Sequence, residues 1–173
     1  DVAVDQTVFV ADGKVKKPNV TVTHAGETLK VNTDYTLAFA KNVLPGRATI
    51  TVTGKGKYTG KVVKYYTLNA THISKADITV SAAEYVTDGT EKKPAVSVAY
   101  NGKTLKAGTD YSVSYIDNVN AGTASVKITG LKYYSGSVEY TFEIKAIELT
   151  DAVVTVDTDD IVADGSKKTP TVN

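Results

Sequence analysis

The feature that most constrains this sequence is a repeat of 76 residues. The stretch TDYTLAFAKN, Thr33 to Asn42, returns as TDYSVSYIDN, Thr109 to Asn118, and many glycine, proline and aspartate positions recur at the same offset without insertion. A third copy begins with Asp164-Gly165. Self-similarity at a fixed period predicts small structural units in series. We expect one unit at residues 1–74, a second at 75–150, and the first strands of a truncated third at 151–173.

The pattern within each copy predicts β-structure. Val, Thr, Tyr and Ile dominate, and apolar residues alternate with a period of two, as along half-buried strands. Asn101-Gly102 lies between two alternating segments and predicts a two-residue hairpin. About seven short strands per 76-residue repeat, separated by Gly, Asn and Asp turns, are typical of an antiparallel β-sandwich. We predict an all-β chain of tandem Ig-like sandwiches.

Comparison of the two copies separates side chains that the fold requires from those that it does not. A side chain that the fold requires is expected in both copies, and ten of the 14 aromatic residues pair in this way. These ten are predicted to pack in the two cores, because aromatic rings supply much of the apolar mass of small sandwiches. The pairs are Phe9 with Tyr85, Tyr35 with Tyr111, Phe39 with Tyr115, Tyr58 with Tyr134, and Tyr66 with Phe142.

Four tyrosines have no aromatic counterpart: Tyr65, Tyr100, Tyr133 and Tyr140. Strand parity directs Tyr65 away from the core, and Tyr133 falls in the loop before the last strand of the second copy. Exposed tyrosine rings can stack on a sugar or on a partner surface, so Tyr65 and Tyr133 are the candidate ligand contacts. The alternative is that they are ordinary exposed aromatics.

No catalytic grouping is visible. The two histidines differ between the copies: Tyr100 replaces His24, which is expected to be half-buried at a strand end, and Glu148 replaces His72 in the linker. Without a nucleophile beside a base we predict no enzymatic activity, and we predict no cofactor. The absence of cysteine argues against structural zinc and thiol chemistry.

An acidic cluster at the start of the third copy is the one candidate metal site. Asp157, Asp159 and Asp160 could supply oxygen ligands to calcium near the junction with the second unit. The other interpretation is a solvated turn, since the cluster does not recur. A Lys–Asn crosslink is a second chemical possibility, because Lys16 or Lys17, Asn42 and Asp34 all have counterparts in the second copy.

Charge and hydropathy limit the partners. The 20 basic and 19 acidic residues are dispersed, so we expect no nucleic-acid binding. No apolar run approaches the roughly 20 residues of a membrane span, and we expect no membrane insertion in this segment. The sequence is interpreted as a segment of a longer protein whose partners are the adjacent domains of its own chain.

The string KTLKAGTDYSVSYIDNVNAGTASVKITG, Lys103 to Gly130, resembles the Ig-like repeats that occur in tandem in large surface and secreted proteins of Gram-positive Firmicutes. The resemblance covers both complete copies and the partial third. It implies a β-sandwich, an extracellular location at the cell surface or in secretion, and a spacer or adhesion role. It brings no catalytic or ligand-binding residue with it.

The function expected from these features is a non-catalytic stalk that separates other modules of a bacterial surface protein. The first alternative is a module that binds a carbohydrate or a host protein through exposed tyrosines. The second is a fibre subunit that self-assembles when the segment from Val153 to Asn173 lends its strands to another molecule.

Overall fold

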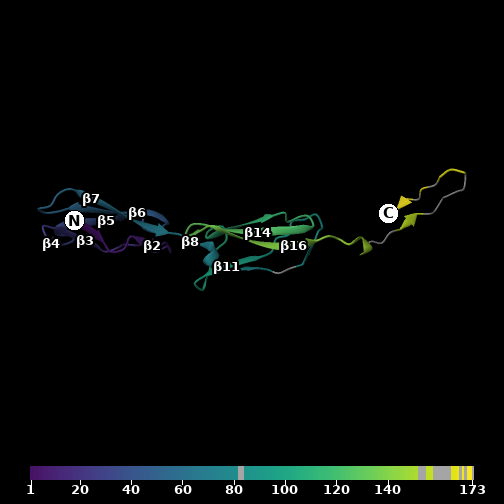
Figure 1. Cartoon of the computed structure of the whole chain (residues 1–173), viewed down its shortest axis with the longest axis horizontal. Helices are drawn as coiled ribbons and strands as arrows, with labels where there is room; N and C mark the ends of the chain where they lie inside the picture. Colours follow the sequence, from purple (N-terminus) through teal and green to yellow (C-terminus); the bar gives the residue numbers. More distant parts are fainter. Residues whose placement is uncertain (82–83, 152–154, 158–164, 168, 170, 173) are drawn as a thin grey trace.

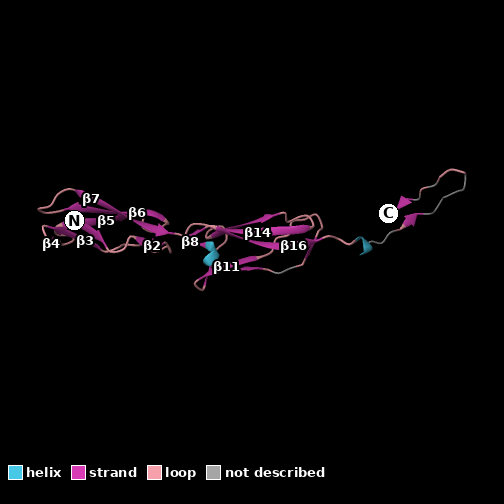
Figure 2. Cartoon of the chain, viewed as in Figure 1, coloured by secondary structure: helices cyan, strands magenta, loops and turns pink. Residues whose placement is uncertain are grey.

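The structure is a computed structural model of the whole chain, and it describes residues 1–81, 84–151, 155–157, 165–167, 169 and 171–172. The described part is all-β, with several sheets and two short 3₁₀ helices (Figures 1 and 2). Two groups of strands dominate. We call β1 to β7 the first unit and the stretch from the first 3₁₀ helix to β16 the second unit.

The first unit contains two sheets. A three-stranded sheet has the order β1-β3-β4 and a four-stranded sheet has the order β2-β7-β6-β5. The strands are β1 (Val2–Val4), β2 (Val8–Val10), β3 (Val20–His24), β4 (Glu27–Thr28), β5 (Tyr35–Ala40), β6 (Gly46–Gly54) and β7 (Lys61–Asn69). The Ala25-Gly26 turn between β3 and β4 has positive φ at both residues, 50° and 84°, as a type I′ turn requires.

The second unit repeats this arrangement at the same offset. Its sheets have the orders β12-β11-β9 and β10-β16-β14-β13. The strands are β9 (Asp77–Val80), β10 (Tyr85–Val86), β11 (Val96–Tyr100), β12 (Lys103–Thr104), β13 (Tyr111–Ile116), β14 (Gly122–Gly130), β15 (Tyr134–Ser135) and β16 (Ser137–Lys145). The predicted Asn101-Gly102 hairpin is confirmed, with φ of 49° and 74°. Two paired sheets in each unit are consistent with a β-sandwich.

The expectation of purely antiparallel sheets is wrong in one respect. β2 lies parallel to β7, and β10 lies parallel to β16. After β1 pairs with β3 in the first sheet, the chain crosses to the other sheet at Asp5–Thr7, and β2 then joins it beside the last strand. A broken first strand therefore contributes to both sheets, which closes each unit at one edge.

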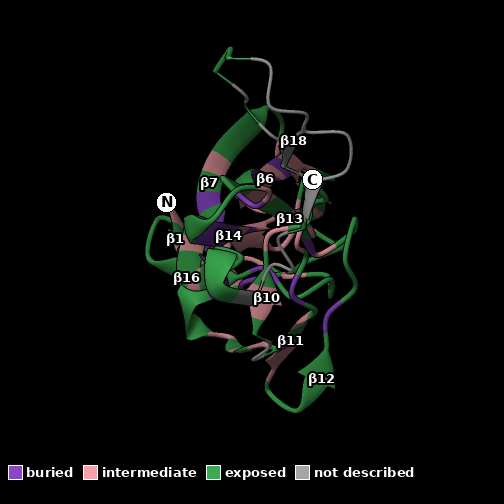
Figure 3. Ribbon diagram, turned by 90° about the vertical axis from the view of Figure 1, so that its right-hand side faces the viewer, coloured by how far each residue is buried: buried purple, intermediate pink, exposed green. Residues whose placement is uncertain are grey.

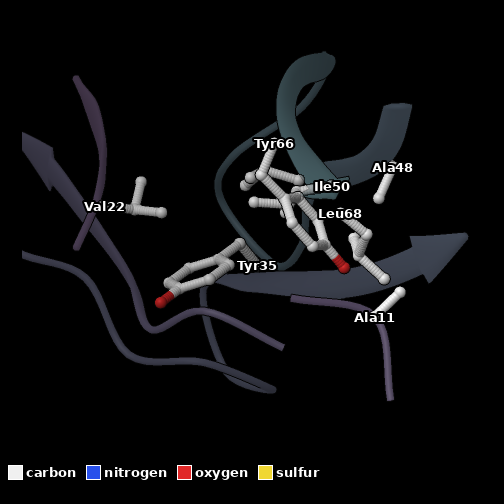
Figure 4. Packing of buried hydrophobic residues seen from close by; sticks show 8 residues of the cluster. Ala11, Val22, Tyr35, Ala48, Ile50, Tyr66 and Leu68 are labelled. Carbon is white, nitrogen blue, oxygen red and sulfur yellow. The ribbon is translucent and has the colours of Figure 1, made fainter. Parts of the chain in front are cut away.

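Each unit has its own core, and the counterpart positions match. In the first unit the buried residues include Tyr35, Ile50, Tyr66 and Leu68, which Figure 4 shows pointing into the space between the strands. In the second unit Tyr111, Val126 and Ile128 occupy equivalent positions. Figure 3 shows buried segments on strands such as β7, whereas β12 and the outer loops are exposed.

Only two short strands of the third copy are described, β17 (Val156–Asp157) and β18 (Thr171–Val172), which pair with each other.

Candidate functional site

The segment between the units, predicted as a linker of about Ala70 to Ala76, is structured. It forms β8 (Thr71–His72) and the 3₁₀ helix η1 (Ile73–Lys75). β8 pairs in parallel with β15 of the second unit, and the Thr71 N–H donates a hydrogen bond to the Tyr133 carbonyl at 2.9 Å. Packing therefore places the start of the second unit near Thr71, before the predicted boundary at residue 74.

Ile73 inserts into the core of the second unit. Its side chain is fully buried and contacts a cluster that contains Val98, Leu105, Tyr111 and Ile128. Complete burial of an isoleucine side chain contributes about 1.5–3 kcal/mol to stability. The segment after the first unit is thus a structural part of the second.

Tyr133 contacts the first unit from the other side of the junction. It is half-buried and packs against the first core cluster, and its ring lies against Gly13, where a Cβ atom would meet the ring carbons at 3.5 Å. Its counterpart in the first unit is Lys57. The sequence singled out Tyr133 as a ligand contact, and the structure gives it an intramolecular partner.

His72 completes the junction. Its Nδ1 lies 2.8 Å from the Ser74 hydroxyl and accepts a hydrogen bond from the Ser74 N–H at 3.3 Å, which caps η1. The other side of the ring covers Gly136, and a Cβ atom at that glycine would overlap the imidazole. The lack of a side chain at Gly136 therefore leaves the space in which the His72 ring of the junction segment lies.

Tyr65 lies on the outer face of β7, as strand parity predicts, and 47% of its surface is exposed. The Arg47 guanidinium stacks over its ring at 3.5 Å from the centroid. Arg47 is the only arginine in the sequence. The exposed Tyr65 ring and the cation on its face form a small, flat surface that is both aromatic and charged. The second unit lacks this surface, because Thr141 is the counterpart of Tyr65 and Thr123 is the counterpart of Arg47.

The expectation that His24 is half-buried needs correction. His24 is exposed, although its ring still packs edge-to-face on Tyr58 at 5.7 Å. Its counterpart Tyr100 makes the same contact with Tyr134 at 5.9 Å and is half-buried. The shorter histidine does not reach far enough over the core to be covered.

The recurring Asn42 and Asn118 have a structural role. The Asn42 side-chain amide donates to the Lys16 carbonyl, and the Lys16 N–H donates to the Asn42 carbonyl. The Lys16 ammonium pairs with Asp12 at 2.8 Å, and the hydrogen bond to this ammonium lowers the pKa of the Asp12 carboxyl. Both groups of the hypothetical Lys–Asn crosslink thus have non-covalent partners.

The aspartate of the repeated TDY stretch is also explained. Asp34 accepts a hydrogen bond from the Lys30 N–H at 2.8 Å, and Asp110 accepts one from the Lys106 N–H at 2.9 Å. Each carboxylate closes the turn that leads into β5 or β13.

The calcium hypothesis falls mostly on residues that are not described. Asp159 and Asp160 lie outside the described residues, and for Asp157 only the backbone strand is described. Among the described residues, no group of three or more His, Cys, Asp or Glu side chains could hold a metal ion. Within the described ranges, no helix has the length and apolar character to cross a membrane.

The sequence interpretation missed Ile73 and Gly136. A signal for Ile73 was present, because Leu149 is an aliphatic residue at the corresponding position. Gly136 also has a glycine counterpart, Gly60, but no local pattern reveals which ring covers it. Comparison of the chain with protein-family models, with curated proteins and with solved structures finds no match.

Proposed function

We propose that this chain is a non-catalytic spacer, built from Ig-like units in tandem, in a bacterial surface or secreted protein. The observation that carries the proposal is the junction: Ile73 is buried in the second core while Tyr133 packs on the first. A spacer must hold its two ends a fixed distance apart. A packed junction limits bending between the units, whereas a flexible linker would not. The family resemblance of Lys103 to Gly130 supports the Ig-like assignment and the extracellular location.

Restricted motion between the units is the property of the proposed spacer that can be measured. The chain has no cysteine, so spin labels can be attached at Thr36→Cys and Ser112→Cys, which are equivalent, exposed positions on β5 and β13. Pulsed electron paramagnetic resonance should give a narrow distribution of distances between the labels. Tyr133→Ala removes the contact with Gly13 and should broaden that distribution.

Tyr140→Ala is the matched control, because Tyr140 is 40% exposed on β16 of the same unit and should leave the distribution unchanged. A distribution that is already broad in the unmodified junction would contradict the spacer proposal.

A binding role is the second candidate, favoured by the Tyr65–Arg47 stack. Aromatic rings with an adjacent cation suit a sugar ring that carries an acidic group, through stacking and charge pairing. A glycan array probed with the full chain tests this role. A signal lost in both Tyr65→Ala and Arg47→Ala supports it, and a signal that both variants retain assigns the binding elsewhere. Strand exchange through the segment from Val153 stays a prediction, since Val153 is not among the described residues.

A further inference from the structure

The loop between β5 and β6 of the first unit forms an open hollow of about 560 Å³, which residues 41–47 line. Two of these residues are basic, Lys41 and Arg47, and both are exposed. Leu44 belongs to the same lining and is 54% exposed. The hollow therefore presents two cationic side chains and one large apolar side chain to solvent.

Neither cation of the hollow has an anionic partner. Within the part of the chain that the structure describes, no ion pair or hydrogen bond reaches the Lys41 ammonium or the Arg47 guanidinium. The Arg47 guanidinium instead stacks over the Tyr65 ring at 3.5 Å from the centroid. The ring supports the plane of the guanidinium and leaves the N–H groups at its edge available. These donors match the two oxygens of a carboxylate.

Hydroxyl groups flank this stacked pair on the outer face of the sheet. In the register of β6 and β7, Arg47 lies opposite Thr67, and Thr49 lies opposite Tyr65. Directly opposite residues share one face of a sheet, as do residues two apart along a strand, so these side chains lie on one face. No described residue forms a hydrogen bond with either threonine hydroxyl. Threonine hydroxyls both donate and accept hydrogen bonds, which suits the hydroxyl groups of a sugar.

The strands around the hollow contain no acidic residue. Although basic and acidic residues balance over the whole sequence, residues 35–69, which form β5 to β7 and their loops, include six basic residues and none that is acidic. The equivalent residues 111–145 include three of each. An anion that approaches β5 to β7 therefore meets a net positive charge on these strands.

The second unit indicates that the fold does not require this charge. Its equivalent loop has Asp117 in place of Lys41 and Thr123 in place of Arg47. Lys41 and Asp117 have almost the same φ, 56° and 55°, so the two loops share this backbone conformation. The Thr123 hydroxyl donates a hydrogen bond to Glu143 at 2.6 Å. The same loop is thus basic in one copy and acidic in the other, and its cations are available for a ligand.

We propose that the hollow and the adjoining outer face of β6 and β7 bind an acidic polysaccharide, a polymer whose successive sugars carry carboxylates. One carboxylate pairs with the edge of the Arg47 guanidinium and another pairs with Lys41. Sugar hydroxyls bond to Thr49 and Thr67. Successive carboxylates are required, because a single exposed ion pair contributes little. This inference rests on the binding role, the second candidate function, and names its ligand class and the extent of its site.

A nucleic acid suits this surface less well than a saccharide does. Proteins that bind single strands use aromatic side chains on which successive bases stack. Arg47 covers one side of the Tyr65 ring. The neighbours on the same face, such as Thr49, Thr51 and Thr67, offer no second ring. Successive bases therefore have no stacking platform here.

Isothermal titration calorimetry of the full chain with polygalacturonate tests the proposal, and fully methyl-esterified polygalacturonate is the matched neutral ligand. The acidic polymer should bind and the ester should not. Arg47→Thr should lower the association constant at least about tenfold, because a charge-assisted bidentate contact is lost. Binding that survives this change overturns the proposal.

Lys127→Thr is the control variant. It also removes one positive charge, from β14 of the second unit, and should bind the acidic polymer as the unmodified chain does. Both variants should fold, because each introduces the threonine that the other unit carries at the equivalent position, Thr123 or Thr51. An equal loss of binding in the two variants would indicate attraction to net charge alone, and the proposed site would be wrong.

Lys41→Asp tests the loop separately, since Asp117 holds the equivalent position at the same φ. It should also weaken binding of the acidic polymer, because attraction is replaced by repulsion. Unchanged binding would exclude the hollow from the site. Tighter binding of single-stranded DNA than of polygalacturonate at equal charge concentration, lost in Arg47→Thr, would assign this face to nucleic acid and overturn the proposal.

The outcomes separate the ligand class from the binding role itself. Equal binding of the acidic polymer and its ester, or no binding of polygalacturonate beside a glycan-array signal that Tyr65→Ala abolishes, overturns the acidic class and leaves the binding role standing. No signal with polygalacturonate or on the array overturns both. The spacer function is measured independently by the distances between the two units.

Discussion

At the scale of single residues, the two copies make the same ring contact with the phenylalanine and the tyrosine exchanged. Phe9 packs edge-to-face on Tyr66 with 5.7 Å between ring centroids, and Tyr85 packs on Phe142 with 5.5 Å. The tyrosine of the pair is Tyr66 in the first unit and Tyr85 in the second, and the edge-to-face contact is present in both. The Tyr66 hydroxyl donates to the Lys16 carbonyl at 2.7 Å, so the ring contact belongs to the scaffold and the hydrogen bond is particular to one unit.

Residue roles were predictable where they depend on volume and parity, and not where they depend on a distant partner. The inward direction of Tyr35 and the outward direction of Tyr65 follow from alternation along a strand. The role of Asn42 did not follow. The positive φ of its loop falls on the preceding Lys41, at 56°, and Asn42 recurs because its amide reaches the backbone of Lys16.

Gly136→Ala should destabilise the second unit more than Gly60→Ala destabilises the first. Both glycines have positive φ, 72° and 89°, so both changes cost about 1–2 kcal/mol of backbone strain. Only at Gly136 must a new Cβ displace the His72 ring. Urea unfolding measures the difference, and amide NMR spectra should show shifts in η1 for Gly136→Ala alone. Equal losses in the two variants would mean that the His72 contact does not constrain the junction.

Stability should fall at alkaline pH. Burial raises the pKa of Tyr66, Tyr115 and Tyr134 above the ordinary value of about 10. The folded protein then keeps these phenol protons to a higher pH than the unfolded chain does, so it binds more protons in that range. The free energy of unfolding is unaffected by these groups below pH 10 and decreases as pH rises through their folded pKa values. Urea titrations between about pH 8 and pH 11.5 measure it, and a constant free energy would contradict the assignment.

At the scale of elements, the strands were predictable because they are local patterns. The repeated hairpin and the strands β5 and β13 appear where alternation and turn residues place them. The parallel pairing of β2 with β7 was not predictable, because it joins residues about 60 positions apart and leaves no mark on either strand. The prediction of an unstructured linker was wrong for the same reason. Residues 71–75 are too few to show a period, and their structure comes from contacts with β14, β15 and β16.

Ile73→Ala tests the inserted segment as an element of the second unit. The change removes three carbon atoms from a fully buried position and should lower the free energy of unfolding of that unit by about 2–5 kcal/mol. Leu149→Ala is the control at the equivalent position. Its side chain is 82% exposed, so in dilute solution it should change stability by less than about 0.5 kcal/mol. Denaturant unfolding distinguishes the two, and equal small effects would show that η1 is not part of the second core.

The whole molecule contains two separate hydrophobic cores. The buried residues of the first include Tyr35, Ile50 and Leu68, and those of the second include Ile73, Tyr111 and Val126. The described members of the two clusters do not overlap, so each unit buries its own apolar surface and is expected to unfold as a body of its own.

Thermal unfolding should therefore show two transitions, one for each unit. Leu68→Ala and Ile144→Ala change equivalent residues that are 1% and 2% exposed. Each should lower its own transition by an amount that corresponds to about 2–5 kcal/mol and leave the other nearly in place. Calorimetry measures both transitions in one scan. A single transition displaced by either change would show that the units unfold as one body.

The position of Ile73 also has a consequence for how such a chain is made. A ribosome releases residues in order, so Ile73 emerges before strands β9 to β16 of the unit whose core it fills. Its side chain lacks its core partners until those strands have been synthesised. Tyr133 emerges later, when every strand of the first unit, whose core it packs against, has already left the ribosome.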